Sequence, residues 1–247
     1  MIKGIYASGS GMLPRMLRLE VIGNNLANIN TTGFKRDNIF VQILKDSAVT
    51  QSQGTGELVG LDVHEYTEFT EGSLKQTNNQ LDVAMQGRGF FVVETPRGVR
   101  YTRNGNFSLS VDGTVVTAQG YPVLGNGGRI QLPDIHKLAQ GDLSITEIGE
   151  IIVDKKPVGT LRIADFEDNS VLKKEAGTYF VASAPEKGAD VDGKDRLIRQ
   201  GFLEESNVDG IEEMIAMVEL SRNFESDQKA MQYQDGTLDK AMEVGRV

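Results

Sequence analysis

The chain has 247 residues, 39% of them hydrophobic and 25% charged, so it is long enough to bury a core and too apolar to be wholly disordered. It contains two histidines and no cysteine, which excludes disulfides, thiolate metal sites and cysteine nucleophiles. The formal net charge of −9 argues against a general nucleic-acid binder, because phosphate contacts need clustered lysine and arginine.

Residues 1–36 are predicted to form an N-terminal helical segment. Apolar side chains recur there every seven residues, which is the spacing of a helix seam, at Ile5, Met12, Leu19 and Leu26, with Ile22 on the same face. Several glycines and Pro14 weaken this helix, so its stability must come from packing. The Asn- and Thr-rich residues 28–33 then end the helix, because such residues favour turns.

The middle of the chain has a different pattern. Residues 37–60 lack sustained periodicity and are predicted to be a linker or an extended arm. Residues 61–203 are predicted to be a β-rich domain, because short alternating or apolar runs are separated by glycine-rich turns. Asp112-Gly113 is a tight-turn signal and predicts a hairpin that joins 107–109 to 115–117.

Residues 204–247 are predicted to form a C-terminal helical segment, with one helix from about 208 to 243. Its apolar side chains again fall seven residues apart, at Met217, Phe224, Met231 and Leu238. Ser206 or Asp209 is suited to cap the first turn. The fold class is therefore α+β, with helical ends that bracket a central all-β domain.

The two ends differ in charge. Residues 1–36 hold five basic groups and one acidic group, whereas residues 204–247 hold eleven acidic and four basic groups. We expect the ends to attract each other, although ordinary solvated helix faces would give the same imbalance.

The sequence offers little chemistry. Neither His64 nor His136 has a partner at metal-ligand spacing, and no complete nucleophile motif is present, so we expect no catalytic, cofactor or metal site. The acidic cluster of Asp165, Glu167 and Asp168 is the weak exception, because paired carboxylates serve acid–base catalysis. Arg88 and Arg103 are interpreted as solvated or ion-paired surface arginines, with ligand contact as the alternative.

Membrane insertion is not expected either. No apolar run approaches the roughly 20 residues of a membrane helix. The first residues also lack the continuous apolar stretch of a cleavable signal, so any export would use another machine.

Four ordered blocks resemble the flagellar basal-body rod and hook protein family. They span nearly the whole chain, and chance similarity of all four is very improbable. The blocks are Asn24-Asn25-Leu26-Ala27-Asn28-Ile29-Asn30-Thr31-Thr32-Gly33-Phe34-Lys35-Arg36, residues 76–91, Tyr101-Thr102-Arg103-Asn104-Gly105-Asn106-Phe107, and Gln200-Gly201-Phe202-Leu203-Glu204-Glu205-Ser206-Asn207-Val208. Within the family the chain is most similar to proximal rod members (FlgF type) and next to distal rod members (FlgG type), because the stretch after residue 34 is short and Arg222-Asn223-Phe224-Glu225 is of the proximal kind.

The resemblance implies a structural subunit of the flagellar rod, with no enzymatic activity. It implies that both ends fold on assembly into an inner coiled-coil layer, with the β domain outside. The apolar seam residues named above would then lie at subunit interfaces. Asn24, Asn25 and Asn28 would fix the register of the seam, or simply end the helix.

The resemblance also implies location and partners. The partners would be other copies of the chain, other flagellar rod proteins and the flagellar type III export apparatus, and the site of assembly would be the periplasmic rod of the basal body. A distal rod or hook-type axial subunit is the alternative within the family. Two alternatives from other classes remain: a secreted oligomeric β-rich binding module, and an enzyme with a defined pocket.

Overall fold

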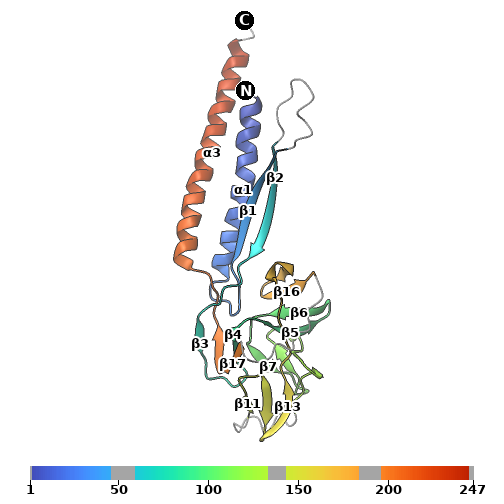
Figure 1. Ribbon diagram of the computed structural model, residues 1–247. Coiled ribbons are helices and arrows are strands. Elements are labelled where there is room, and N and C mark those ends of the chain that lie inside the picture. Colours follow the sequence, from blue (N-terminus) through green and yellow to red (C-terminus); the bar gives the residue numbers. More distant parts are fainter. Residues whose placement is uncertain (1, 46–58, 133–142, 184–195, 245–247) are drawn as a thin grey trace. The chain divides into compact units, whose positions relative to one another are not determined.

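The computed structural model describes residues 2–45, 59–132, 143–183 and 196–244. A long helix stands at each end of the chain, α1 (Ile2–Ala27) and α3 (Gly210–Val244), and the described residues between them are mostly strands (Figure 1). The predicted α+β class, with a helix at each end of an all-β middle, is confirmed. The chain divides into a helical unit of residues 1–27, 37–66 and 209–247, and a β unit of residues 28–36 and 67–208.

The helical unit is built on α1 and α3, which lie side by side (Figure 1). Pro14 lies inside α1, where it removes a backbone donor and weakens the helix, so packing must stabilise it. At the start of α3 the carboxylate of Asp209 accepts hydrogen bonds from the backbone amides of Ile211 (2.9 Å) and Glu212 (3.2 Å). This contact satisfies two amides that a helix start leaves open, and it confirms the predicted capping role of Asp209.

A two-stranded sheet completes the helical unit. β1 (Asp37–Lys45) pairs with β2 (Val59–Thr67), and β1 also contacts α1. The predicted linker or extended arm at 37–60 therefore contains one whole strand and the start of another, and the predicted boundary at residue 61 falls inside β2. Apolar residues in 39–44 do not alternate, so alternation alone did not reveal β1, whereas Val59, Leu61 and Val63 alternate as expected for a strand.

The β unit consists of short antiparallel sheets. Its five-stranded sheet has the order β14-β5-β6-β16-β15, beside a three-stranded sheet β11-β12-β13 and the pairs β17-β4, β18-β3, β7-β8 and β10-β9. The strands are β3 (Leu74–Gln76), β4 (Val83–Gly87), β5 (Phe90–Thr95), β6 (Gly98–Thr102), β7 (Phe107–Leu109), β8 (Val115–Thr117), β9 (Leu124–Gly125), β10 (Gly128–Arg129), β11 (Leu143–Ile145), β12 (Glu150–Val153), β13 (Lys156–Thr160), β14 (Ile163–Ala164), β15 (Leu172–Ala176), β16 (Tyr179–Ala182), β17 (Arg196–Gln200) and β18 (Phe202–Glu204). The predicted Asp112-Gly113 hairpin is confirmed, because β7 pairs with β8 across that turn.

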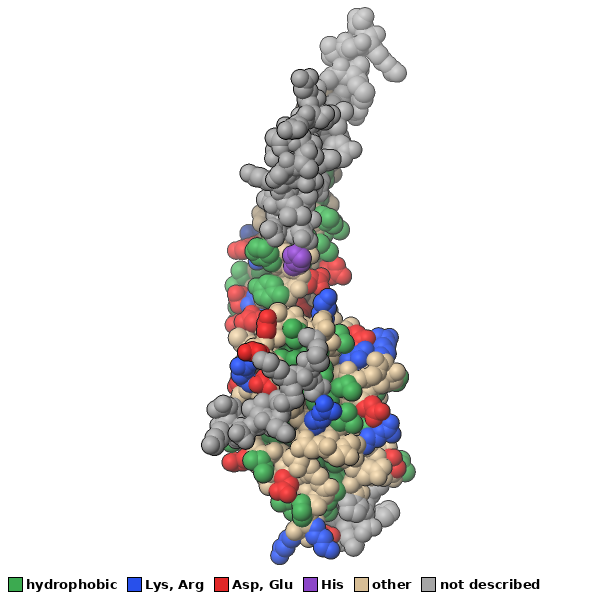
Figure 2. All heavy atoms as spheres, turned by 45° about the vertical axis from the view of Figure 1, so that its right-hand side comes forward, with side chains coloured by type: hydrophobic (Ala, Val, Ile, Leu, Met, Phe, Trp, Pro, Cys, Tyr) green, Lys and Arg blue, Asp and Glu red, His purple; other side chains and the backbone are tan. Residues whose placement is uncertain are grey.

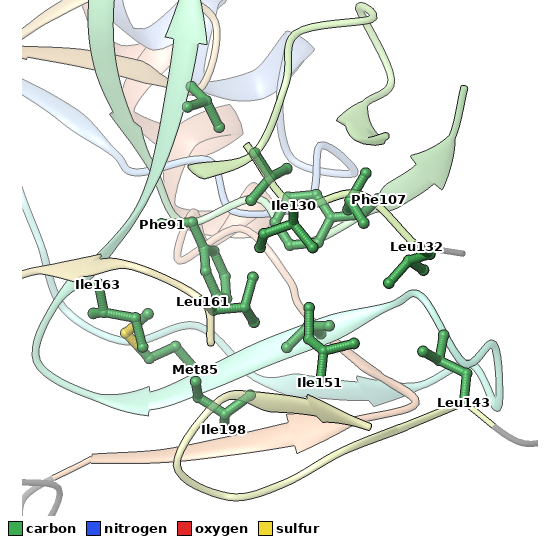
Figure 3. Packing of buried hydrophobic residues seen from close by; sticks show 14 of the residues in the cluster. Met85, Phe91, Phe107, Ile130, Leu132, Leu143, Ile151, Leu161, Ile163 and Ile198 are labelled. Carbon is green, nitrogen blue, oxygen red and sulfur yellow. The ribbon is translucent and has the colours of Figure 1, made fainter. Parts of the chain in front are cut away.

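Two buried clusters stabilise the β unit. Figure 3 shows the larger one, in which side chains from β4, β5, β12 and β17 point toward one another, among them Met85, Phe91, Ile151 and Ile198. The smaller one is aromatic, and Phe90 packs edge-on against Phe180 at a centroid distance of 5.9 Å. Aromatic edge contacts of this kind add about 0.5–1.5 kcal/mol beyond the area that they bury.

The first and last segments of the β unit come from opposite ends of the sequence. α1 ends at Ala27, and residues 28–36 fold with the β unit rather than with the helix, so the predicted helical segment 1–36 spans two units. The β unit also runs to Val208, beyond the predicted limit of 203. Gly33 lies in the turn region that follows α1, and its φ of +68° is in the left-handed region that favours glycine.

An exposed ion-pair group on the five-stranded sheet gives a pH-dependent prediction. Glu175 on β15 forms ion pairs with Arg100 and with Arg97 (3.0 Å to Arg97), and these contacts hold the pKa of Glu175 at about 2. A carboxyl whose pKa is lowered on folding contributes stability above its ordinary pKa of about 4.5, and this contribution is lost as pH falls toward 2. Urea unfolding of the Glu175→Gln variant is expected to depend less on pH between 4.5 and 2 than that of the unchanged chain. Equal pH dependence would contradict the ion-pair assignment.

Candidate functional site

The two terminal helices are antiparallel partners. Arg15 on α1 forms an ion pair with Asp227 on α3, and Nδ2 of Asn25 donates to Oε1 of Glu213 at 3.3 Å. The partner number falls along α3 as the number rises along α1, which sets the direction of the pair. The ion pair between Arg15 and Asp227 agrees with the attraction expected from the opposite charges of the two ends. Because both partners are partly exposed, it contributes no more than about 1 kcal/mol.

The predicted seam residues lie at matching heights along this pair. The two polar contacts bring Leu19 within about one helical turn of Phe224, and Met12 within about one turn of Met231. Met12 and Ile22 are buried, and five others are half-buried: Leu19, Leu26, Met217, Phe224 and Met231. The side chains of Ile5 and Leu238 lie outside the described part of the chain.

The three predicted asparagines have different surroundings. Asn25 is buried, donates from Nδ2 to the carbonyl oxygen of Asp37 (2.9 Å), and accepts at Oδ1 from the Asp37 amide (3.0 Å). Asn28 lies in the β unit, where its carbonyl oxygen accepts from the amide of Thr31 (3.1 Å) in the turn after α1. Asn24 is exposed. Asn25 thus connects α1 to β1 and α3.

A second apolar face on α3 was not identified as such from the sequence. Ile211, Met214, Ile215 and Val218 are 49–69% exposed and follow the i, i+3, i+4, i+7 spacing of one helix face. On α1, Leu13 and Met16 are 53% and 52% exposed. Met214 is 49% exposed, so about half of its side chain faces solvent. We call these six residues the outer apolar face.

Exposed hydrophobic residues also occur elsewhere. Figure 2 shows one side of the molecule, on which hydrophobic side chains (green) stand among acidic and basic ones. Phe40 on β1 and Tyr66 on β2 are 57% and 54% exposed. The helical unit therefore carries apolar groups at its surface on all four of its elements, which is typical of a surface that binds another protein.

The β unit contains a buried charged cluster, made by Lys35, Glu204 and Arg103. Nζ of Lys35 is 2.5 Å from Oε1 of Glu204, and Nη1 of Arg103 is 3.5 Å from Oε2 of the same carboxylate. The side chains of Lys35, Glu204 and Arg103 are 0%, 1% and 5% exposed. Burial lowers the pKa of Lys35, Glu204 opposes this shift, and Arg103 adds to it.

Backbone groups complete this cluster. Nζ of Lys35 donates to the carbonyl oxygen of Thr70 (2.5 Å), Nη2 of Arg103 to that of Gly87 (2.8 Å), and the amide of Gly72 to Glu204 (3.1 Å). Nε of Arg103 has no hydrogen-bond partner among the described residues. Each block that carries the family resemblance supplies one member, in the order Lys35, Gly87, Arg103 and Glu204.

The cluster corrects the interpretation of Arg103, which is buried and not at the surface. An isolated arginine gives no sign of burial in a sequence, because its partner Glu204 lies 101 positions away. Arg88 does lie at the surface, with its side chain 63% exposed, and donates from Nη2 to the carbonyl oxygen of Phe166 (2.6 Å).

The carboxylate cluster has local structural roles. Asp168 caps a short 3-10 helix, η1 (Asn169–Val171), by accepting from the amide of Ser170 at 2.8 Å. Asp165 accepts from the amide of Phe166 (2.9 Å) and lies 3.7 Å from Arg88. His64 is exposed on β2, and His136 lies outside the described residues.

The described residues contain neither a metal-binding cluster nor a helix suited to span a membrane. They contain no group of three or more histidine, aspartate and glutamate side chains placed to hold a metal ion. Neither helix, as far as its residues are described, combines the length and hydropathy that crossing a bilayer requires.

Three family descriptions match the chain in order. Residues 5–35 match "Flagella basal body rod protein", residues 84–153 match "Flagellar hook protein FlgE/F/G D1 domain", and residues 199–244 match "Flagellar basal body rod FlgEFG protein C-terminal". The first and third matches include α1 and α3, and the second lies within the β unit. The residues that match the family descriptions therefore include parts of both the helical unit and the β unit.

Curated relatives cover the chain from end to end. The flagellar basal-body rod protein FlgF of Rhizobium meliloti (strain 1021) is 34% identical over 245 residues, 98% of this chain and 97% of the relative. The rod protein FlgG of Bacillus subtilis (strain 168) is 31% identical over 270 aligned positions, 100% of both chains. The FlgF of Caulobacter vibrioides is 31% identical over 237 residues, 94% of this chain and 93% of the relative. The chain therefore belongs to the flagellar basal-body rod protein family, and it is a structural subunit of the bacterial flagellar rod.

Proposed function

We propose that the chain polymerises through its helical unit, and that the terminal helices of many copies form a coiled-coil layer of the rod. The outer apolar face carries this proposal, because six exposed large hydrophobic residues on two helices lose contact with water only if another helix covers them. The seam residues would hold α1 to α3 within a copy, and the outer face would contact neighbours. Contacts between unlike faces need not close into a ring, so they generate a helical polymer.

The proximal position in the rod is part of the same proposal. The alignment with FlgG from Bacillus subtilis has 270 positions against 247 residues in this chain, so at least 23 of its positions lack a counterpart here. The alignment with FlgF from Rhizobium meliloti needs only 245 positions. A chain without the longer insertion fits the proximal, FlgF-type role better than the distal one.

The remaining parts of the proposal concern export, location and chemistry. We infer that the chain passes through the flagellar type III apparatus, assembles in the periplasm with other rod proteins, and catalyses no reaction. In support, the carboxylates Asp165 and Asp168 are engaged in a turn, an ion pair and a helix cap, and the buried Glu204 carboxylate is paired with Lys35 and Arg103.

The double variant Ile215→Asp/Val218→Asp tests the interface. Each carboxylate would be buried without a partner in the polymer, at a cost of several kcal/mol per subunit, whereas both side chains are exposed in a single copy. We expect the variant to fold normally, to fail to polymerise and to abolish motility in a strain that carries it in place of the unchanged gene.

The matched control is the double variant Asn223→Asp/Gln228→Asp, which introduces the same two charges at other exposed positions of α3. Normal polymers and motility are expected for this control. If Ile215→Asp/Val218→Asp polymerised as well as the control, the outer apolar face would not be an interface.

A further inference from the structure

Within the β unit, the segment that follows α1 is bound to the segment that precedes α3. Besides the ion pair of Lys35 with Glu204, the amide of Gly33 donates to the carbonyl oxygen of Glu204 (2.8 Å), and the amide of Arg36 donates to Oδ1 of Asn207 (2.7 Å). Two of these three contacts are made by one residue, Glu204. The β-unit segment that follows α1 and the β-unit segment that precedes α3 are therefore neighbours.

These two segments lie close to the helices in sequence. α1 ends at Ala27, eight residues before Lys35, and α3 begins at Gly210, six residues after Glu204. With the β unit unfolded, pairing of α1 with α3 closes a loop of about 180 residues, whereas with this contact formed the free connection is about 14 residues. Closure probability falls as about the 3/2 power of loop length, so the contact raises the effective concentration of one helix at the other by about 50-fold.

We propose that the Lys35–Glu204–Arg103 cluster is a clasp that couples closure of the β unit to the pairing of the terminal helices. This role lies beyond polymerisation, because it operates within a single chain. When the clasp is closed, α1 and α3 are held near each other by short connections. When the clasp is open and the β unit is unfolded, α1 and α3 are connected only through the roughly 180 residues between them.

Because the clasp consists of buried charges, it forms only when the β unit is completely folded. Lys35, Arg103 and Glu204 come from three distant parts of the chain, and each is costly to bury alone. The carboxylate of Glu204 has both of its cationic partners only when all three segments are in place. A purely apolar contact would form more readily in a partly folded chain, and the coupling would then be weaker.

Hydrogen exchange of the full-length, monomeric chain tests the clasp, with Glu204→Gln as the variant. We expect amides at 12–27 in α1 and 211–230 in α3 to lose up to about 50-fold in protection, the factor set by the loop lengths. The matched control is Glu205→Gln, which alters the next carboxylate, at a more exposed position. Its helices are expected to keep their protection within about two-fold.

Glu204→Gln leaves two buried cations and is the harsher change, so Lys35→Met serves as a second variant, in which Arg103 still faces the carboxylate. It is expected to lower helix protection in the same direction and by a smaller factor. The outcome that overturns the proposal is helix protection equal to that of the Glu205→Gln control in both variants, whether or not the amides of the β unit become exposed. A loss in the helices of both variants, absent from the control, supports the clasp.

Discussion

Replacing Phe224 by aspartate is expected to separate α1 from α3 and to prevent polymerisation. Phe224 is half-buried at the height of Leu19, so the variant loses apolar contact and places a carboxylate against apolar side chains. We expect the helix pair to be destabilised by about 2–4 kcal/mol, from lost burial together with the cost of an unpaired charge. Hydrogen exchange of the α1 amides, together with polymer formation, measures this effect.

The neighbouring position supplies a control for this prediction. Asn223→Asp introduces the same charge on the same turn, but Asn223 is exposed. We expect its helix protection to stay within about two-fold of the unchanged chain. Equal loss of protection in both variants would mean that the seam lies on another face of α3.

The largest effect on the β unit is expected from Gly105→Ala. A Cβ atom at Gly105 would lie 1.6 Å from the carbonyl oxygen of Val83 and 2.8 Å from its carbonyl carbon, so backbone would have to move. The amide of Val83 also donates to the carbonyl oxygen of Gly105 (3.0 Å), and this contact would be lost. We expect the free energy of unfolding to fall by more than about 3 kcal/mol in urea titrations.

Gly159→Ala is the matched control for Gly105→Ala. It is another glycine of the β unit, on β13, and a Cβ atom there would have no heavy atom within 4 Å. Alanine in a strand loses less conformational entropy than glycine on folding, so we expect unchanged or slightly higher stability. A fall of similar size in both variants would contradict the close approach of Gly105 to Val83.

Much of the secondary structure was predictable because it depends on neighbours in sequence. The apolar residues of α1 and α3 repeat at helical spacing, Asp209 stands where a helix start needs an acceptor, and Asp112-Gly113 permits only a few turns. The end of α1 was predictable as well, from the turn-forming residues after Ala27. These features needed no knowledge of distant partners.

The features that were missed depend on distant partners. Lys35 and Arg103 look like surface cations until Glu204 is placed between them, and no local pattern indicates that they meet. Strand β1 lacks alternating apolar residues, so its pairing with β2 and its contact with α1 define it. Heptad counting found one face of α3 and could not separate it from the outer apolar face, because both faces are apolar.

The side chain of Asn25 gives the helical unit a further property. Its amide exchanges two hydrogen bonds with the backbone of Asp37, as a residue of an adjacent strand would do. The side chain of Asn25 therefore pairs with the backbone of Asp37 as a neighbouring strand would. These two hydrogen bonds join the end of α1 to the start of β1. Only an amide side chain offers both a donor and an acceptor in this arrangement, so aspartate, although it has the same shape, would leave the Asp37 carbonyl oxygen without its donor. The end of α1 and the start of β1 should consequently move together.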